Sequence, residues 1–421
     1  GPLRGDVPLP GDKSIGHRAL ILGALADGAT VIRGLSSGED NASTITVLRG
    51  LGVAVEREGD LVRVHGRGAE GLRAPTAPLD CGNSGSTMRM MCGVLAGRPF
   101  TSRLDGDASL RRRPMQRVVD PLQKLGARFE TEDGKPPITV HGGSLRAGRI
   151  EIPVASAQLK TAVLLAGLQA KGTTTVVEPA LSRDHTERML PSFGVAVARP
   201  EPLAASVTGP ARLRACEIDV PGDPSAAAFW LVAGSIVAGS RLRLRRVSLN
   251  PTRTGAIDVL RAMGARLEIA SLDPIGEEPV ADLTVEPAPL RATTVAGETM
   301  LRAIDELPVL AIAAAAATGV TTFADAAELR VKESDRLATM AAGLATLGVR
   351  VEELPDGLVV HGGSGLEGGE VDACGDHRIA MAFVVASLVA RGPVRIRGVE
   401  AIAVSDPRFL ETLERLCGGS A

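Results

Sequence analysis

Blocks of apolar positions recur along this chain at intervals of about 70 residues. Each block opens with small polar or charged residues, continues as a stretch rich in Ala, Leu and Val, and reaches a glycine. Six such segments occur, at residues 11–28, 82–97, 156–172, 222–239, 305–319 and 375–392. Their starts lie 71, 74, 66, 83 and 70 residues apart. Recurrence at a fixed interval of this kind indicates an internal structural repeat.

The two ends of each apolar stretch are typical of a helix. Asp, Ser or Asn precedes the stretch, where a side-chain oxygen can accept a backbone N–H. The glycine after it suits a left-handed C-cap, and a short strand is expected next, as at residues 29–32 and 173–177. A second helix should then end in a Leu-x-x-x-Gly signature, which occurs at 48–52, 122–126, 190–194, 260–264 and 344–348. Two signatures in register favour a true repeat over chance recurrence in an Ala-rich chain.

Composition narrows the class of protein. The 421 residues predict two or three domains, and 44 % hydrophobic with 23 % charged residues is an ordinary globular balance. Aromatic residues make up only 2 %, which argues against a binder of single-stranded nucleic acid, because such proteins stack bases on aromatic rings. The net charge of −2 means that any basic site is local. We therefore expect an α/β (α+β) protein of two lobes, with three repeats in each.

The cysteines and apolar runs bear on location. Five cysteines occur, an odd number, and no two form C-x-x-C, which fits a reducing compartment better than a disulfide framework or a zinc ribbon. The apolar runs are too short to span a bilayer, and no basic-then-apolar leader opens the chain. We expect a cytoplasmic protein with neither a membrane nor a nucleic acid as partner.

The helix starts carry cations. A helix N-terminus favours anions, because it presents unpaired N–H groups and a partial positive charge. Lys and Arg side chains lie on or near these starts at Lys13, Arg18, Arg89, Lys160 and Arg378. Others lie in the polar stretches between copies, at Arg113, Arg183, Lys332 and Arg336. Two phosphorylated substrates that each carry a carboxylate would bring a charge of about −5 to −6, which six to eight cations would neutralise.

A simpler interpretation exists for each charged residue. An isolated Arg is more often a solvated surface charge, and the alternation at residues 241–246 is interpreted as one exposed face of a strand. Asp305 and Glu306 open the fifth helix, and residues 331–336 place two acids between two bases. An acid beside cations stays ionised and suits a general base. A self-neutralising surface turn explains the same spacing equally well.

The segment 11–18, Gly-Asp-Lys-Ser-Ile-Gly-His-Arg, resembles the opening motif of the 5-enolpyruvylshikimate-3-phosphate (EPSP) synthase family. The resemblance extends along nearly the whole chain, through motifs at residues 82–89, 113–115, 156–160, 183–187, 222–225, 250–255, 330–336 and 376–381. The segments at 183–187 and 250–255 resemble the bacterial branch that includes glyphosate-tolerant enzymes.

The resemblance implies a fold and a reaction. The fold would be the two-lobed enolpyruvyl transferase fold of six βαβαββ-type units, with residues 1–12 and 224–421 in one lobe, residues 13–223 in the other, and the active site in the cleft between them. The reaction would transfer the enolpyruvyl group of phosphoenolpyruvate (PEP) to the 5-hydroxyl of shikimate 3-phosphate and release phosphate. No metal or organic cofactor is implied, and a monomer is expected.

The resemblance also implies roles for individual residues. Shikimate 3-phosphate would be held by Lys13, Ser14, Arg18, Ser156, Ala157, Gln158, Arg183, Asp305 and Lys332. PEP would be held by Lys13, Gly85, Arg113, Gln158, Arg336 and Arg378. The catalytic residues would be Asp305, which accepts the hydroxyl proton, Glu333, which delivers a proton to the methylene carbon of PEP, and Lys13, which assists the departing phosphate.

Three departures from the family pattern matter. Gly16 stands where Ser is frequent, and Ala157 replaces a frequent second Ser. Residues 403–407 lack the Lys that many members carry before an aromatic-Pro pair, so one cation to PEP is absent or supplied from elsewhere. Gly85 leaves room where tolerant enzymes carry Ala, and we therefore expect glyphosate to inhibit.

The fourth copy, at residues 222–225, supplies no named group and is interpreted as the hinge-side copy.

Two alternative functions stay open at this point. One is the sister enolpyruvyl transferase that acts on UDP-N-acetylglucosamine, which opens with Lys-Asn and uses a loop Cys. Here Ser14 follows Lys13, and residues 111–114 contain no Cys. The other alternative is a non-catalytic anion-binding protein that keeps the fold.

Overall fold

The computed structural model describes residues 1–418, and this part of the chain forms two compact units. Unit 1 comprises Gly1–Pro10, Pro221–Pro274 and the chain from Pro279 onward. Unit 2 comprises Gly11–Val220 and the short segment Ile275–Glu278. Within residues 1–418 each unit contains three sheets, so there is one sheet for each predicted repeat. The prediction of a two-lobed α/β fold built from repeats is confirmed.

The sheets of unit 2 belong to the first three copies of the repeat. The first sheet contains β2 (Ala26–Arg33), β3 (Ala54–Glu58), β4 (Leu61–Arg67), β12 (Leu213–Arg214) and β13 (Glu217–Asp219). The second sheet contains β5 (Leu79–Asp80), β6 (Thr101–Asp105), β7 (Arg128–Glu132) and β8 (Lys135–His141). The third sheet contains β9 (Arg149–Glu151), β10 (Gly172–Val177) and β11 (Ala204–Gly209). The helices are α1 (Lys13–Leu25), α2 (Glu39–Gly50), α3 (Gly85–Ala96), α4 (Gln116–Lys124), α5 (Ala157–Gly167) and α6 (His185–Met189).

The sheets of unit 1 belong to the last three copies. They are β1 (Arg4–Val7) with β14 (Arg241–Ser248), β15 (Arg266–Ser271) and β16 (Val280–Glu286); β17 (Thr294–Val295) with β18 (Gly319–Phe323), β19 (Arg350–Leu354) and β20 (Gly357–Gly362); and β21 (Gly369–Asp372) with β22 (Val394–Arg397). The helices are α7 (Pro224–Ile236), α8 (Gly255–Ala262), α9 (Gly297–Ala303), α10 (Leu307–Ala316), α11 (Arg336–Thr346), α12 (His377–Ser387) and α13 (Phe409–Cys417). No described helix is long and apolar enough to cross a membrane.

The fifth copy shows the topology of the repeat most simply. Strand β17 is parallel to β18, with α9 and α10 between them in the sequence, and β20 runs antiparallel to both β18 and β19. Two copies borrow their first strand from a distant part of the chain. Strand β1 pairs in parallel with β14 of the fourth copy, and β13 pairs in parallel with β2 of the first copy. This exchange explains why the N-terminal segment belongs to unit 1.

Capping residues define where the main helices begin. The side chains of Asp12, Ser84, Ser156, Asp223 and Asp376 each accept a backbone N–H from the first turn of their helix, as predicted. The fifth start differs, because a 3₁₀ turn at Ile304–Glu306 leads into α10 and no side-chain cap is made within the described residues. The carboxylates at this start are therefore available for other contacts.

The Leu-x-x-x-Gly signature is a Schellman motif in every copy where it occurs. In the first copy the Val53 N–H donates to Leu48 O (3.0 Å) and the Gly52 N–H to Arg49 O (2.9 Å). The same pair of bonds closes the other four copies. The last residues of these signatures all have positive φ, between 79° and 93°, at Gly52, Gly126, Gly194, Gly264 and Gly348. These positions require glycine, because a Cβ crowds the backbone there.

The glycines after the first helices do not act as predicted. Helix α1 ends at Leu25, and its C-cap Ala26 is already extended, with φ −83° and ψ 157°. Gly28 then lies inside β2 with φ 109°. The glycine of the second copy, Gly97, is a C-cap with φ −94°, which is not left-handed. The prediction of left-handed C-caps here is wrong, because α1 turns directly into β2 and α3 ends in a right-handed turn before β6.

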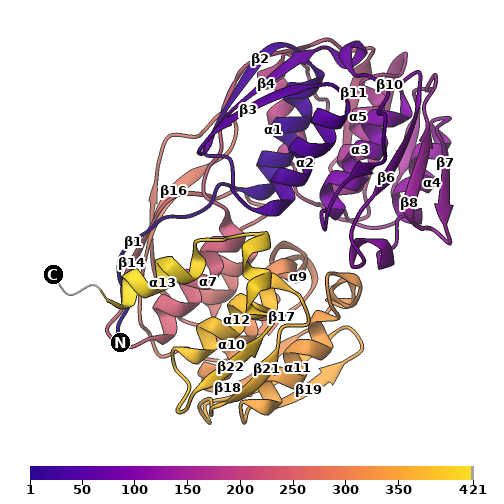
Figure 1. The fold of residues 1–421 in the computed structure, drawn as a ribbon. Helices are drawn as coiled ribbons and strands as arrows, with labels where there is room; N and C mark the ends of the chain where they lie inside the picture. Colours follow the sequence, from indigo (N-terminus) through magenta and orange to yellow (C-terminus); the bar gives the residue numbers. More distant parts are fainter. Residues whose placement is uncertain (419–421) are drawn as a thin grey trace. The chain divides into compact units, whose positions relative to one another are not determined.

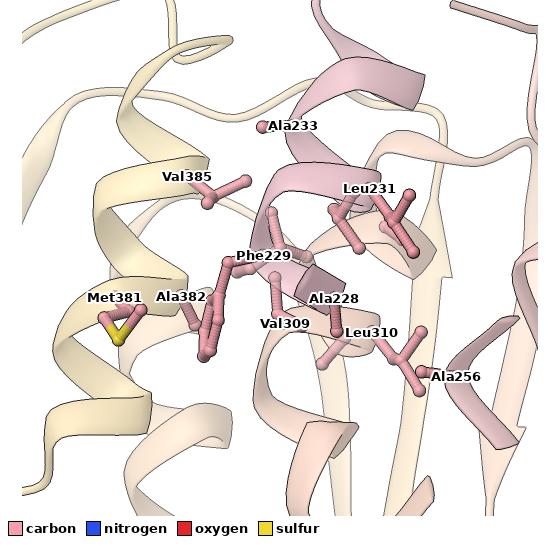
Figure 2. Close-up of a cluster of buried hydrophobic side chains, with 14 of the residues drawn as sticks. Ala228, Phe229, Leu231, Ala233, Ala256, Val309, Leu310, Met381, Ala382 and Val385 are labelled. Atoms are coloured by element: carbon pink, nitrogen blue, oxygen red, sulfur yellow. The ribbon is translucent and has the colours of Figure 1, made fainter. Parts of the chain in front are cut away.

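Each unit has a separate core built mainly from aliphatic side chains. In unit 1, α7, α10 and α12 lie side by side (Figure 1). Phe229 of α7, Val309 and Leu310 of α10, and Met381 and Val385 of α12 belong to the cluster that fills the space between these helices (Figure 2). Burial of this surface stabilises the packing by about 25 cal/mol per Å². This packing holds the starts of α7, α10 and α12 close to one another.

The exposed face predicted at residues 241–246 is confirmed. Arg241, Arg243 and Arg245 of β14 are exposed, while Leu242 and Leu244 are buried. The three arginines form ion pairs on the surface with Glu286, Asp282 and Asp6. These cations are therefore engaged by the sheet itself.

Candidate active site

The N-terminal ends of α1 and α5 meet around Arg18 in unit 2. This side chain is buried and donates to Thr186 Oγ1 (2.7 Å), Thr161 Oγ1 (2.9 Å) and the backbone oxygens of Ser14 (2.8 Å) and Ala157 (3.3 Å). Arg18 therefore ties the start of the first copy to the start of the third.

Arg183 reaches the same place from the loop before α6. Its Nη1 donates to Ser14 Oγ at 3.3 Å. Ser14 is therefore contacted by two cations, by Arg183 at its hydroxyl and by Arg18 at its backbone oxygen. The predicted residues Ser14, Arg18 and Arg183 are brought together.

The start of α3 joins this group through Gln158. Gln158 Oε1 accepts from Arg89 Nη1 (2.8 Å), and its Nε2 donates to Ser86 Oγ (2.8 Å). Arg113 comes from the segment before α4, where its Nη2 donates to Asn83 Oδ1 (2.5 Å). The amide of Gln158 therefore connects the third copy to the second.

Gly85 faces two of these guanidinium groups. A Cβ at this position would lie 2.8 Å from Arg89 Nη1 and 3.3 Å from Arg113 Nη1. Because Gly85 is the first residue of α3, the N–H groups of the helix start lie beside both cations. The absence of a side chain leaves this surface open to an anion.

Lys13 begins α1 and is paired within unit 2. Its Nζ lies 2.5 Å from Asp40 Oδ2, and both side chains are partly exposed. Asp40 lies in the first turn of α2, and Asn41 of the same turn donates to Lys13 O (3.2 Å). Sequence reasoning missed Asp40, because a partner 27 residues away has no local signal.

A buried hydroxyl chain supports the starts of α1 and α3. His17 Nδ1 lies 2.7 Å from Thr44 Oγ1, which lies 2.7 Å from Thr87 Oγ1, and this hydroxyl donates to Ser84 Oγ (2.8 Å). Thr44 must then donate to Thr87, so His17 Nδ1 carries the proton. Burial lowers the pKa of His17 to about 3, and the imidazole is neutral at physiological pH.

Lys160 is not an open anion-binding cation. It is almost fully buried, with Nζ 2.9 Å from Glu178 Oε1 and 2.8 Å from Glu187 Oε1. Burial acts to lower the pKa of Lys160, but the two carboxylates outweigh it and the net shift is upward. This triad fixes the segment from Glu178 to Glu187, which carries Arg183.

The predicted residues of unit 1 gather around Arg336, which starts α11 and is 1 % exposed. Its Nε donates to Asp376 Oδ2 (2.7 Å), its Nη2 to Glu333 Oε2 (2.6 Å), and its Nη1 lies 3.4 Å from Asp305 Oδ1. Burial acts to lower the pKa of Arg336, but these carboxylates outweigh it and raise the pKa. One guanidinium therefore fixes three acids and keeps them close together.

Lys332 lies next to this cluster, with Nζ 3.7 Å from Asp305 Oδ1. The Asp305 carboxylate raises the pKa of Lys332, but desolvation and Arg336 together outweigh it, so the pKa is lowered. A lysine with a lowered pKa releases a proton more easily than one in water.

Arg378, in the first turn of α12, completes the group. Its Nη1 donates to the backbone oxygen of Asp305 (2.9 Å) and lies 3.6 Å from Glu306 Oε1. Its remaining N–H groups have no hydrogen-bond partner among residues 1–418. Arg378 consequently keeps donors for a ligand, whereas Arg336 is mostly engaged by carboxylates.

The predicted residues thus form two clusters, each within one unit. Unit 2 contains Lys13, Ser14, Arg18, Gly85, Arg113, Ser156, Ala157, Gln158 and Arg183, and unit 1 contains Asp305, Lys332, Glu333, Arg336 and Arg378. Ser156 serves as the cap of α5 and Ala157 contributes its backbone oxygen, which a missing hydroxyl does not affect. Sequence reasoning missed Thr161, Thr186 and Asp376 as partners, although Thr186 and Asp376 both stand in motifs of the family resemblance.

The segment that lacks the family lysine is occupied by a buried acid. Asp406 is 5 % exposed and caps the following turn by accepting from the Arg408 N–H (3.2 Å). Burial raises the pKa of Asp406 to about 6, and the nearby Asp223 carboxylate adds to the shift. Residues 403–407 therefore supply no cation of their own.

Comparisons with known proteins agree along nearly the whole chain. A profile of the family described as EPSP synthase (3-phosphoshikimate 1-carboxyvinyltransferase) matches residues 1–413. The chain is 55 % identical to a 3-phosphoshikimate 1-carboxyvinyltransferase of Halorhodospira halophila, over 99 % of this chain and 94 % of that protein.

Solved structures give the same result. The structure of EPSP synthase from Acinetobacter baumannii is 42 % identical and superimposes with a TM-score of 0.88, covering 99 % of this chain and 96 % of that one. The enolpyruvyl transferase NikO from Streptomyces tendae shares the fold, with a TM-score of 0.79 and 20 % identity, covering 99 % of this chain and 94 % of that one.

Proposed function

The chain belongs to the EPSP synthase family, and we propose that it transfers the enolpyruvyl group of PEP to the 5-hydroxyl of shikimate 3-phosphate. The products are EPSP and phosphate, and the step belongs to the shikimate pathway to chorismate and the aromatic amino acids. The observation that carries the proposal is the Arg336 cluster, in which a single guanidinium holds the two acids that the reaction needs, Asp305 and Glu333.

The unit 2 cluster supplies most of the contacts to shikimate 3-phosphate. In the proposal, Arg18, Arg183 and the starts of α1 and α5 bind the phosphate and hydroxyls, together with Lys13, Ser14, Ser156, Ala157 and Gln158. Asp305 and Lys332 of unit 1 contribute to the same substrate. The two guanidinium groups around Ser14 support this assignment, because their positive charges favour a phosphate at this place.

PEP is assigned to cations of both clusters. Arg113 and the open helix start at Gly85 would bind it on unit 2, with Lys13 and Gln158. Arg336 and Arg378 of unit 1 would bind the same molecule. The unengaged donors of Arg378 favour it over Arg336 as the direct ligand of unit 1.

The chemistry proceeds by addition and elimination. Asp305 accepts the 5-hydroxyl proton while the oxygen bonds to the second carbon of PEP, and protonated Glu333 delivers a proton to the third carbon, which becomes a methyl group. The bond to the phosphate oxygen then breaks, Glu333 removes a methyl proton, and the vinyl group reforms. Lys13 assists the departing phosphate by donating a proton or neutralising its charge. No metal or organic cofactor enters the proposal.

Other properties follow from the same assignment. Glyphosate, which carries a phosphonate and a carboxylate, would compete with PEP, because Gly85 leaves its site open. We also propose a cytoplasmic monomer that acts on small molecules only.

Phosphate release tests the proposal directly. The purified protein should release phosphate when both substrates are present, and mass spectrometry should identify EPSP as the second product. UDP-N-acetylglucosamine in place of shikimate 3-phosphate should give no release, and its turnover would favour the sister activity. Tight binding of shikimate 3-phosphate without any release would favour a non-catalytic protein.

A further inference from the structure

Two sequence motifs of unit 1 have no role in the site described above. They are the segments at residues 222–225 and 250–255, in the fourth copy of the repeat. The structure joins them to Arg378 through buried polar side chains, each at most 8 % exposed. We call Asp223, Ser225, Arg253, Glu306 and Arg378 the α7 network.

The first half of the α7 network is centred on Arg253. Its Nη2 lies 3.1 Å from Asp223 Oδ1 and donates to Ser225 Oγ (2.8 Å). Asp223 Oδ1 also accepts the Ser225 N–H (2.8 Å) as the cap of α7. Because Arg253 is 3 % exposed, its charge needs these partners.

The second half runs from Ser225 to Arg378. Ser225 Oγ accepts from Arg253, so its own O–H is directed to Glu306 Oε1. Glu306 Oε1 in turn lies 3.6 Å from Arg378 Nη1. Glu306 Oε2 has no hydrogen-bond partner within the described chain. The position of this carboxylate therefore depends on the contacts of a single oxygen.

We propose that Ser225 and Arg253 are positioning residues that set PEP affinity by fixing Glu306 against Arg378. The inference rests on the proposed role of Arg378 as a PEP ligand. Glu306 orients one end of the guanidinium and leaves the remaining N–H groups directed to the substrate. In this proposal the fourth copy supports the site through Glu306 and Arg378, a role that the sequence did not assign to it.

Ser225→Ala tests this inference, with Ser235→Ala as its control. Ser235 lies on the same helix and is 1 % exposed, but its hydroxyl donates only to Leu231 O of that helix. Ser225→Ala should raise the KM for PEP about tenfold, since it removes a hydrogen bond to a buried charge. The KM for shikimate 3-phosphate should stay within twofold, and Ser235→Ala should change neither constant.

Rescue and independent variants complete the test. Ser225→Thr restores a hydroxyl and should return the KM for PEP toward that of the wild type. Glu306→Gln keeps the shape of the carboxylate and should also raise the KM for PEP, which preserves the test if Ser225→Ala folds poorly. Equal rises in both KM values, or no rise in either variant, would overturn the inference.

Arg378→Lys separates failure of the inference from failure of the proposed function. Arg378→Lys could raise the KM for PEP while Ser225→Ala and Glu306→Gln leave that KM unchanged. This result would keep Arg378 as a PEP ligand but show that the α7 network does not position it. An unchanged KM for PEP in Arg378→Lys would remove the PEP role itself, and the inference with it.

Discussion

Replacing Lys160 by Met should destabilise unit 2 strongly and in a pH-dependent way. The change leaves Glu178 and Glu187, 2 % and 4 % exposed, without their shared cation. At contacts of 2.8 and 2.9 Å each ion pair contributes an attraction of about 6 kcal/mol at an effective dielectric constant of 20, much of which desolvation offsets. Removing one partner of a buried pair usually costs about 3–5 kcal/mol, which is the loss we expect at pH 7.5.

The pH dependence identifies the cause of that loss. In the wild type the pKa of Lys160 is raised, so its stabilisation is fully present at neutral pH and is lost only as the pH rises through the folded-state pKa. In the variant the two buried carboxylates are relieved when they take up protons. The loss should therefore shrink as the pH falls from 7.5 to 5.5.

Urea unfolding followed by circular dichroism measures this effect, and a triple variant controls for it. Lys160→Met combined with Glu178→Gln and Glu187→Gln removes all three charges and should recover most of the stability. The KM for shikimate 3-phosphate should rise in the single variant, since the triad holds the segment that carries Arg183. A loss below about 1 kcal/mol, or one that does not change with pH, would refute the reasoning.

Three further changes probe other parts of the molecule. Gly85→Ala should raise the KM for PEP by about tenfold, because its Cβ would displace the guanidinium group of Arg89 and press on that of Arg113. Initial rates measure the change, and an unchanged KM would contradict the assignment. Burial raises the pKa of Asp406 to about 6, so the folded state binds its proton more tightly than the unfolded state and stability falls as the pH rises from about 4 to 6. Asp406→Asn should abolish this fall and stabilise unit 1 by at most about 3 kcal/mol at pH 7.5, as urea unfolding at several pH values would show. Gly264→Ala should lower the free energy of unfolding by about 1–2 kcal/mol in the same assay, since the φ of Gly264 is 89°. An alanine variant as stable as the wild type would contradict the Schellman assignment.

Local signals explain what the sequence predicted well. Each cap and each Schellman motif depends on residues within one turn of its own helix, so Asp12 or Gly52 can be interpreted without knowing the rest of the fold. The repeat was visible because both signals recur in register. The predicted C-cap at Gly28 is wrong, because a glycine with positive φ is equally suited to a helix end and to the first residues of a strand.

Pairing between distant residues could not be predicted. Lys13 was recognised as a cation, but its carboxylate partner Asp40 lies 27 residues away, and Arg336 binds Asp376 across 40 residues. Counting cations at helix starts therefore overstated the positive charge that is open to substrates. Lys160 shows the difference most clearly, because its charge is used inside unit 2.

Deuterium incorporation from solvent tests the central claim most directly, which is that Glu333 protonates the third carbon of PEP. With both substrates in D₂O, the wild-type protein should form EPSP that carries deuterium on its vinyl carbon, since the third carbon gains a deuteron on addition and loses one of its three hydrogens on elimination. Glu333→Gln should keep binding shikimate 3-phosphate but lose both turnover and deuterium incorporation. Undiminished incorporation in Glu333→Gln, or EPSP formed by the wild type without deuterium, would contradict the account.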